Sequence, residues 1–230
     1  MDLDLETPDH TTLSRRGGTT VVPAFVTLNS EPIHLVVDST GLKIVGDGEW
    51  HAHKHKISNK RRSWRKLHLG VDGDGFIVAS ALTESGVDDA SIGVAMIEEN
   101  EARTARVTAD GAYDTRAIYE ALATVGVPEV VIVIPPRKTA SRSRPAEETL
   151  RQRDAAIARI AEVGRQQWRK ESGAHQQARA ENGMFRFKRI LGDHLRSRSP
   201  DGQKTEAMIG VNILNRMTAL GMPESVAVAA

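Results

Sequence analysis

Short apolar runs separated by turn residues fill the middle of the chain and predict β-strands. The predicted strands comprise residues 33–37, 67–71, 76–82, 105–109 and 130–134. The sequence Asp-Gly-Asp-Gly at 72–75 lies between the second and third strands, and its glycines permit positive φ angles, so a tight hairpin is expected there. Pro135 and Pro136 end the last strand because proline has no amide hydrogen to donate to a neighbouring strand.

Helical patterns alternate with these strands and continue after them. The predicted helices comprise residues 88–100, 115–125, 150–170, 175–192 and 204–220, with a capped helical turn at 9–16. Three strands are thus followed by helix, strand, helix, strand and further helices. This order predicts an α/β fold in which helices flank a mixed β-sheet. Residues 137–149 are rich in Arg, Lys, Ser and Pro, which predicts a mobile basic loop.

Composition sets the size of this fold and its compartment. The chain has 230 residues, of which 40% are hydrophobic, and this is enough for one substantial core. It has no cysteine, so disulfide frameworks and thiolate metal sites are excluded. No stretch of the sequence is apolar enough to span a membrane, and no signal peptide precedes the first strand, so we expect a cytoplasmic protein.

Two acidic residues that directly follow predicted strands are candidates for chemistry. Asp38 and Asp110 occupy these positions, where a carboxylate projects from the edge of a sheet into the crevice in which loops begin. If the two strands are neighbours, the carboxylates repel each other unless cations neutralise them. Taken singly, each aspartate is equally well explained as a turn residue, because aspartate commonly stabilises turns after strands.

A third acidic residue, Glu181, lies in a basic helical stretch. Positions 181, 184, 185 and 188 share one helix face, which includes Met184 and Phe185. We therefore expect Glu181 on the buried side of its helix. A buried carboxylate needs a partner, and a metal ion is a suitable one.

The residue types of this acidic set favour hard divalent cations. Carboxylate oxygens without thiolates favour Mg²⁺ or Mn²⁺ over zinc. Two such ions, about 3.5–4 Å apart, stabilise the attacking and leaving oxygens of an in-line displacement at phosphorus. Asp38, Asp110 and Glu181 are therefore the predicted ligands of two ions. Asp114, in contrast, is expected to cap the helix that begins at Thr115, and Asp72 to belong to the hairpin.

Five sequence motifs in one order carry a family resemblance. They occupy residues 37–43, 64–72, 109–115, 134–138 and 180–192. From about Leu3 to about Leu220 the chain resembles the DDE transposases of bacterial insertion sequences, in the subgroup called the IS-five type. The resemblance implies a ribonuclease-H-like catalytic domain at residues 31–221, with the three acidic residues as its catalytic triad.

The same resemblance implies an activity and its partners. It implies metal-dependent DNA strand cleavage and strand transfer, which together carry out DNA transposition and recombination. The expected partner is double-stranded DNA, as transposon ends and target, bound by a homodimer on paired ends near the nucleoid. Family members carry an N-terminal helical DNA-binding domain, so residues 1–30 are expected to be a remnant or linker after a missing domain. Residues 222–230 are expected to be a flexible tail.

The chain departs from the family in the helix that carries Glu181. The family has Tyr and Arg upstream of the glutamate, where this chain has Ala174 and Gln177. Loss of the arginine removes a bidentate phosphate clamp, so we expect metal binding to survive and DNA positioning to weaken. Two alternatives therefore stay open. One is a catalytically impaired transposase remnant that only binds DNA, and the other is a related nuclease that cuts without joining ends.

Clusters of basic residues, rather than the net charge of +1, indicate where DNA would bind. A basic hairpin region at 43–66 is expected to contact phosphates. Its predicted DNA-binding residues are Lys54, Lys56, Lys60, Arg61, Arg62, Arg65 and Lys66. Lys188 stands two helical turns after Glu181 and, with Arg186 and Arg189, can present cations to a phosphate. A solvated basic helix is the alternative for the two arginines.

Overall fold

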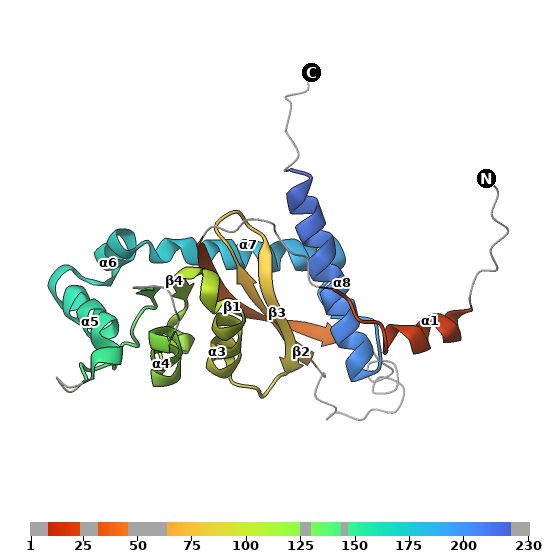
Figure 1. Ribbon diagram of the computed structural model, residues 1–230, viewed down its shortest axis with the longest axis horizontal. Coiled ribbons are helices and arrows are strands. Elements are labelled where there is room, and N and C mark those ends of the chain that lie inside the picture. The colour runs from red at the N-terminus through yellow and green to blue at the C-terminus, as the bar shows by residue number, and fades with distance from the viewer. Residues whose placement is uncertain (1–8, 24–31, 46–63, 125–129, 144–146, 222–230) are drawn as a thin grey trace, which may run out of the picture.

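A β-sheet with helices on both faces forms the body of the molecule (Figure 1). The computed structural model describes residues 9–23, 32–45, 64–124, 130–143 and 147–221. The strands of this part are β1 (Ile33–Ile44), β2 (Trp64–Val71), β3 (Ile77–Glu84), β4 (Thr104–Ala109), β5 (Val131–Val133) and β6 (His194–Leu195). They form a sheet in the order β3-β2-β1-β4-β5, with β6 beside β1.

The sheet is mixed, as the sequence predicts. β1 pairs antiparallel with β2, and β2 antiparallel with β3, which gives the expected hairpin. β4 is parallel to both β1 and β5. A parallel neighbour requires a crossover, and α3 (Asp89–Glu99) and α4 (Arg116–Thr124) supply the two crossovers. This arrangement is that of a ribonuclease-H-like core, so the predicted fold class is confirmed.

The strand period of two divides the core between the two faces of the sheet. Leu35 and Val37 of β1 pack with α3 and α4, in one apolar cluster. Val36 and Leu42, which point the other way, pack with α7 (Ala178–Arg186) and α8 (Pro200–Ala219) in a second cluster. The polar residue Asp38 has the same parity as Val36, so its side chain belongs to the layer that faces α7.

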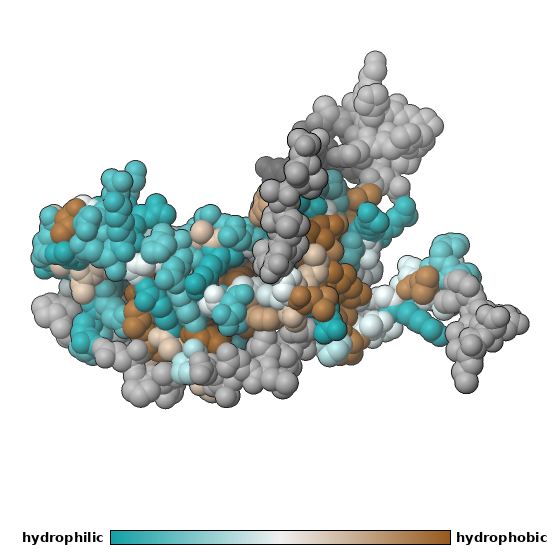
Figure 2. Space-filling view, turned by 90° about the horizontal axis from the view of Figure 1, so that it is seen from above, coloured by the Kyte–Doolittle hydropathy of each residue, from teal (hydrophilic) through white to brown (hydrophobic). Residues whose placement is uncertain are grey.

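Two predicted helices are interrupted in the structure. The helix expected at 150–170 is two helices, α5 (Arg151–Val163) and α6 (Arg165–Ser172), because Gly164 adopts a φ angle of +81° between them. The helix expected at 175–192 comprises the 3₁₀ turn η4 (Ala174–Gln177), α7 and the π-helical segment η5 (Phe187–Leu191). α5 and α6 form one end of the molecule, and Figure 2 shows that hydrophilic residues cover this end.

The terminal helix α8 covers the edge strand β3. Asn215 of α8 is 1% exposed, and its side chain pairs with Ile77 in both directions: its amide donates to the carbonyl oxygen at 2.7 Å and its oxygen accepts from the amide at 2.7 Å. This contact satisfies backbone groups that an edge strand otherwise leaves unpaired. None of the helices in the described ranges is long and apolar enough to cross a membrane.

Candidate active site

Asp38 and Asp110 lie side by side on neighbouring strands. Val37 of β1 is the partner of Ala109 in β4, so the next residue on each strand is one of the two aspartates. Neighbouring strands are about 4.8 Å apart, which places the two carboxylates close together. The expectation that Asp38 ends its strand is wrong, because β1 continues to Ile44 against β2 and the short β6. Asp38 nevertheless lies where the parallel ladder with β4 stops.

The two aspartates differ in their local roles. Asp110 ends β4 and caps the 3₁₀ turn η2 (Gly111–Tyr113), since its Oδ1 accepts a hydrogen bond from the amide of Ala112 at 2.8 Å. Asp38 stabilises no turn, and its Oδ1 accepts from the amide of the next residue, Ser39, at 2.8 Å. The turn explanation therefore accounts for Asp110 in part, and does not account for Asp38.

Helix α7 brings Glu181 towards this pair. Gln177, just before α7, is buried, and its amide donates to the carbonyl oxygen of Val37 at 3.1 Å. Glu181 follows four residues later, one turn along the same face of the helix. The expectation that Glu181 is buried is wrong, because Glu181 and Phe185 are exposed, and the buried positions of α7 are Ala180, Gly183 and Met184.

The charges of the three acidic residues act on one another. Burial and, to a smaller extent, the negative charges of Asp110 and Glu181 together raise the pKa of Asp38 to about 6, against the opposing hydrogen bonds from Ser39 and Gln177. Within the described ranges, no lysine, arginine or histidine forms an ion pair with Asp38, Asp110 or Glu181. The site therefore concentrates negative charge that its own cations do not neutralise.

The donor chemistry fits a divalent cation, but the side-chain arrangement fits only in part. Adjacent carboxylates with unneutralised charge are the ligands that Mg²⁺ and Mn²⁺ prefer. However, no three His, Asp or Glu side chains of the described residues are grouped closely enough to hold a metal ion. Glu181 is exposed in the first turn of α7, so its side chain can change rotamer without disturbing the core.

The two positions that depart from the family signature are both buried. Ala174 is 3% exposed and packs with Val133 and Trp168. Gln177 is 9% exposed and lies against Val37 and Asp38, with its Oε1 unpartnered among the described residues. The resemblance implies a phosphate-clamping arginine at position 177, whereas the glutamine of this chain is buried. The structure places its side chain against the strand that carries Asp38.

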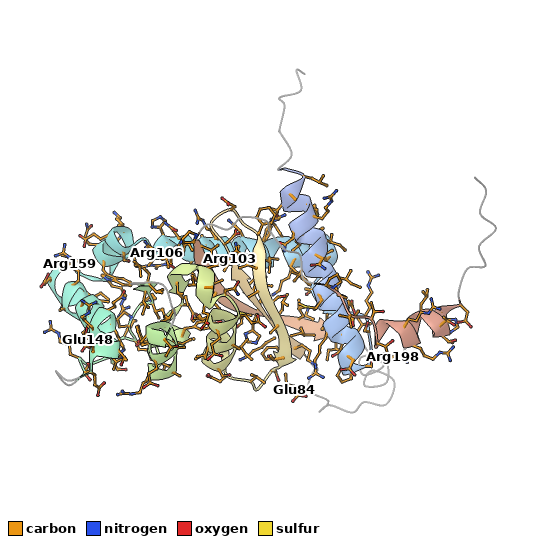
Figure 3. All side chains as sticks on the ribbon, in the orientation of Figure 1. Glu84, Arg103, Arg106, Glu148, Arg159 and Arg198 are labelled. Atoms are coloured by element: carbon orange, nitrogen blue, oxygen red, sulfur yellow. The ribbon has the colours of Figure 1, made fainter. Side chains whose placement is uncertain are left out.

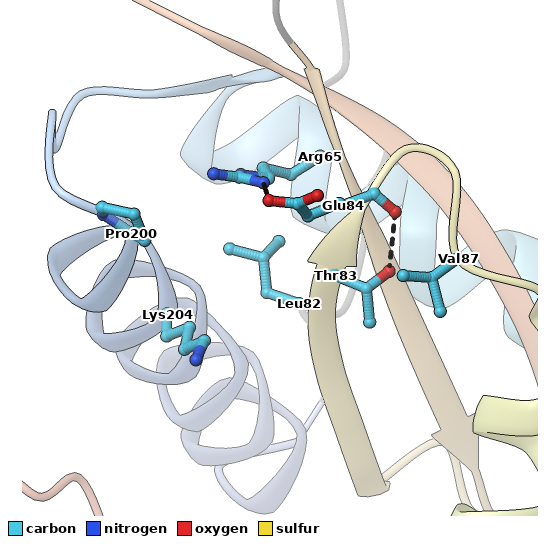
Figure 4. Close-up of a pocket in the computed structure, with 7 residues that line it drawn as sticks. All are labelled: Arg65, Leu82, Thr83, Glu84, Val87, Pro200 and Lys204. Atoms are coloured by element: carbon cyan, nitrogen blue, oxygen red, sulfur yellow. Dashed lines mark hydrogen bonds and ion pairs between the residues drawn. The ribbon is translucent and has the colours of Figure 1, made fainter.

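Most of the basic hairpin region lies outside the described residues. This applies to Lys54, Lys56, Lys60, Arg61 and Arg62. The two remaining members, Arg65 and Lys66, lie in β2 and make contacts within the protein. Arg65 donates to Gln203 and pairs with Glu84, both at 3.0 Å, beside a pocket of about 260 Å³ that Lys204 and Pro200 of α8 also line (Figure 4).

The second basic residue, Lys66, is also engaged. Its ammonium group donates to the carbonyl oxygen of Val87 at 2.8 Å and pairs with Asp89 at 3.2 Å. The side chains of Arg65 and Lys66 are 19% and 18% exposed, so a DNA phosphate would have to compete with these internal partners.

The basic residues after Glu181 divide into two groups. Arg186 is directed to α8, where it donates to Thr218 Oγ1 at 3.0 Å and to the carbonyl oxygen of Leu214 at 3.4 Å. Lys188 is half-buried and Arg189 exposed, and neither forms an ion pair with a described residue. Lys188 and Arg189 can therefore meet a phosphate, whereas Arg186 holds the end of α7 against α8.

A second polar cluster borders the acidic site on the α7 face of the sheet. His34 of β1 bonds to Thr108 at 2.8 Å, and its pKa is lowered to about 4 by burial and then by the charges of Arg106 and Arg179. Arg106, labelled in Figure 3, donates to the carbonyl oxygen of Ser172 at the end of α6. It thereby ties β4 to the turn that leads into α7. The sequence pattern did not single out these residues.

Asp114 has a different role from the predicted helix cap. Its side chain is fully buried and forms an ion pair with Arg153 of α5 at 2.7 Å. It also accepts hydrogen bonds from the amide of Arg137 at 3.0 Å and from the hydroxyl of Tyr119 at 3.3 Å. Asp114 therefore connects the turn after Asp110 to α5 and to the segment after β5. A buried acid so close to Asp110 carries no distinctive sequence signal, because Arg153 lies 39 positions away.

Comparison with known families agrees with this geometry. The family described as "Transposase DDE domain" matches residues 29–216 through one of its models, and a second model with the same description matches residues 1–47. The first match spans most of the chain and includes β1, β4 and α7, which carry the three acidic residues. With a mixed sheet between two helical layers and this match, the chain belongs to the family of transposase DDE domains.

Proposed function

We propose that this chain catalyses metal-dependent DNA strand cleavage and strand transfer, as a transposase of the IS-five type. The observation that carries the proposal is the position of three carboxylates. Asp38 and Asp110 occupy adjacent points of the sheet, Glu181 is close enough to act on the pKa of Asp38, and none has a cationic partner in the described ranges. The motifs at 37–43 and 109–115 support the subgroup assignment.

Asp38, Asp110 and Glu181 are the residues that would hold Mg²⁺ or Mn²⁺, up to two ions. When bound, the ions would lower the pKa of water or a 3′-hydroxyl and neutralise charge at the reacting phosphate. The chain itself fixes Asp38 in the centre of the sheet and Asp110 on its capped turn. Lys188 and Arg189 would orient the DNA backbone by contact with phosphates.

The substitution Asp110→Asn tests this function. The variant keeps a side-chain oxygen that can accept from Ala112 and loses the charge that would bind a cation, so the fold should survive. We expect loss of Mg²⁺-dependent nicking of supercoiled plasmid and loss of Mn²⁺ binding measured by electron paramagnetic resonance. Asp74→Asn, the same change at an exposed position in the β2–β3 turn, is the matched control. Undiminished nicking by the Asp110 variant would refute the catalytic assignment.

A DNA-binding remnant without catalysis is the second candidate. The exposed, unclustered position of Glu181 and the buried Gln177 favour it. Wild-type protein that binds duplex DNA but neither cleaves it nor binds Mn²⁺ would support this candidate. A related nuclease would instead cleave DNA without joining a 3′ end to a target, and a strand-transfer assay separates that outcome.

Assembly and location belong to the same proposal. We expect a homodimer on paired transposon ends, close to the nucleoid, since transposition needs both ends. Apolar side chains of α8 are exposed at Ile209, Ile213 and Met217, as is Leu220 just after the helix, and a partner subunit could cover them. Sedimentation with and without paired-end DNA would measure the stoichiometry, and a strictly monomeric complex would contradict the expectation.

A further inference from the structure

The segment after β5, residues 135–143, presents a group of cations next to Asp110. It reads Pro-Pro-Arg-Lys-Thr-Ala-Ser-Arg-Ser and contains no acidic residue. Arg137, Lys138 and Arg142 are exposed. We call these residues the 135–143 loop. Residues 137–149 were expected to form a mobile basic loop, and the described part of this range contacts the rest of the protein at several points.

The first set of contacts joins the loop to the turn after Asp110. A Cβ atom on Gly111 would lie 3.2 Å from the carbonyl oxygen of Pro135, so the two backbones approach closely. The amide of Arg137 donates to Asp114, and its guanidinium lies 3.5 Å from the carbonyl oxygens of Gly111 and Ala112. Arg137 is therefore placed directly beside the two residues that follow Asp110.

The second set of contacts joins the loop to α5. Arg153 donates to the carbonyl oxygen of Ser141 at 3.1 Å, and the amide of Ser143 donates to Asp154 at 2.9 Å. Between Arg137 and Ser141 the chain makes a turn with Lys138 at its tip. The amide of Ala140 closes this turn by donating to the carbonyl oxygen of Arg137 at 2.9 Å. These contacts hold the backbone of the loop against the rest of the protein, which would reduce the backbone conformational entropy lost on binding.

The positive charges of the loop are not neutralised by ion pairs with described residues, unlike those of two other arginines at this end of the molecule. Arg116 pairs with Glu147 at 2.9 Å and Arg159 with Glu171 at 2.9 Å, so their charges are neutralised within the protein. Arg137, Lys138 and Arg142 form no ion pair with any residue in the described ranges. A fixed, exposed group of unneutralised cations beside a phosphodiester-cleaving site suits one class of ligand, a polyanionic backbone.

We propose that the 135–143 loop binds the phosphate backbone of duplex DNA beside Asp110. Arg137 and Lys138 make the contacts nearest the acidic site, and Arg142 extends the surface towards α5. The proposal rests on the proposed function for the identity of the ligand, but its physical basis, the ordered cationic loop, is independent of metal binding. It adds to the DNA surface residues that the sequence motifs did not assign to DNA.

The test measures how DNA affinity depends on salt. Fluorescence anisotropy with a labelled duplex of mixed sequence, in EDTA, compares wild-type protein with the double variant Arg137→Ala/Lys138→Ala between about 50 and 200 mM salt. Each lost phosphate contact should reduce the slope of log K against log salt by about 0.9, so the double variant should lose about 1.8. The control is Arg169→Ala/Lys170→Ala, the same charge change at exposed positions of α6.

Each outcome decides the proposal separately from the catalytic function. A reduced slope in the loop variant with an unchanged slope in the control supports the surface, even if the wild-type protein never cleaves DNA. Equal slopes in all three proteins overturn it, even if cleavage is normal. Absence of wild-type DNA binding also overturns it. A charge-conserving variant, Arg137→Lys/Lys138→Arg, should keep the wild-type slope, and a reduced slope there would count against charge as the basis of binding and so against the proposal.

Discussion

Neutralising Asp114 should destabilise the fold strongly, because this residue holds three segments around the candidate site. Its carboxylate receives Arg153 Nε at 2.7 Å and Nη2 at 3.3 Å, together with the amide of Arg137 and the hydroxyl of Tyr119. The Asp114 side chain is 0% exposed and that of Arg153 is 17% exposed. A change at either residue therefore leaves a charge in a poorly solvated place.

The size of the effect follows from which charge remains. Asp114→Asn leaves the guanidinium of Arg153 in partial contact with water, so the expected loss is about 3 kcal/mol, the lower end for breaking a buried pair. Arg153→Met leaves the fully buried carboxylate with two neutral donors, and the expected loss is about 4 kcal/mol. The double variant retains neither charge, so it should be more stable than Arg153→Met alone.

Urea unfolding followed by circular dichroism measures these free energies, provided that the slope with denaturant is the same for all four proteins. The coupling energy of the double-mutant cycle, about 2 kcal/mol or more, is the decisive quantity. If the two single losses simply add in the double variant, Asp114 and Arg153 do not stabilise each other, and the account of the loop anchor is wrong. Exposed Glu120→Gln on α4 controls for removal of an acid elsewhere.

Three further predictions follow from single contacts. Asn215→Ala should lower the free energy of unfolding, measured with urea, by about 2–4 kcal/mol, because it leaves the backbone amide and carbonyl of Ile77 unpaired. Gly93→Ala should lower the thermal midpoint, since its Cβ would lie 2.9 Å from ring carbons of Tyr113, and overpacking costs about 1–3 kcal/mol; an unchanged midpoint would contradict this. The pKa of His34 is lowered to about 4 in the folded protein, so between pH 6.5 and 4 the unfolded chain binds more protons than the folded one. The free energy of unfolding should therefore decrease as the pH is lowered through this range. His34→Asn should lose less stability than wild type between those pH values, measured by urea titration.

The fold was predictable because its signals are local. Alternation and apolar runs located β1 to β5, and the glycines of the turn at 72–75 located the hairpin. What the sequence did not reveal depends on neighbours that are distant in the chain. β1 continues past Asp38 because β2 and β6 pair with residues 39–44, although this stretch is not an apolar run. The helix break at Gly164 was also missed, since glycine inside a helical pattern does not by itself require a positive φ angle.

The candidate site was predictable to the extent that sheet register determines it. β1 and β4 are parallel neighbours and Val37 is the partner of Ala109, so Asp38 and Asp110 lie side by side. The sequence pattern placed each aspartate directly after one of these two partner residues. Glu181 was assigned to a buried face from periodicity alone, but helix faces are set by what the helix packs on. A Cβ atom on Gly183 would lie 3.4 Å from Cγ2 of Val71 in β2, so α7 packs on the sheet through Gly183. Glu181 consequently lies on the exposed side of the helix.

The burial of Ala174 and Gln177 changes which experiment can test their importance. A double substitution that restores the family residues at both positions is not a clean test, because Ala174 packs with Val133 and Trp168, and a tyrosine there would overpack the junction of β5 and α6. Gln177→Arg alone is the cleaner change, because Asp38 can pair with the new guanidinium. If position 177 acts by orienting Asp38, this variant should alter Mn²⁺ affinity and leave the salt dependence of DNA binding unchanged. If it acts as a phosphate clamp, the salt dependence should instead steepen by about 0.9, the increment for one added phosphate contact.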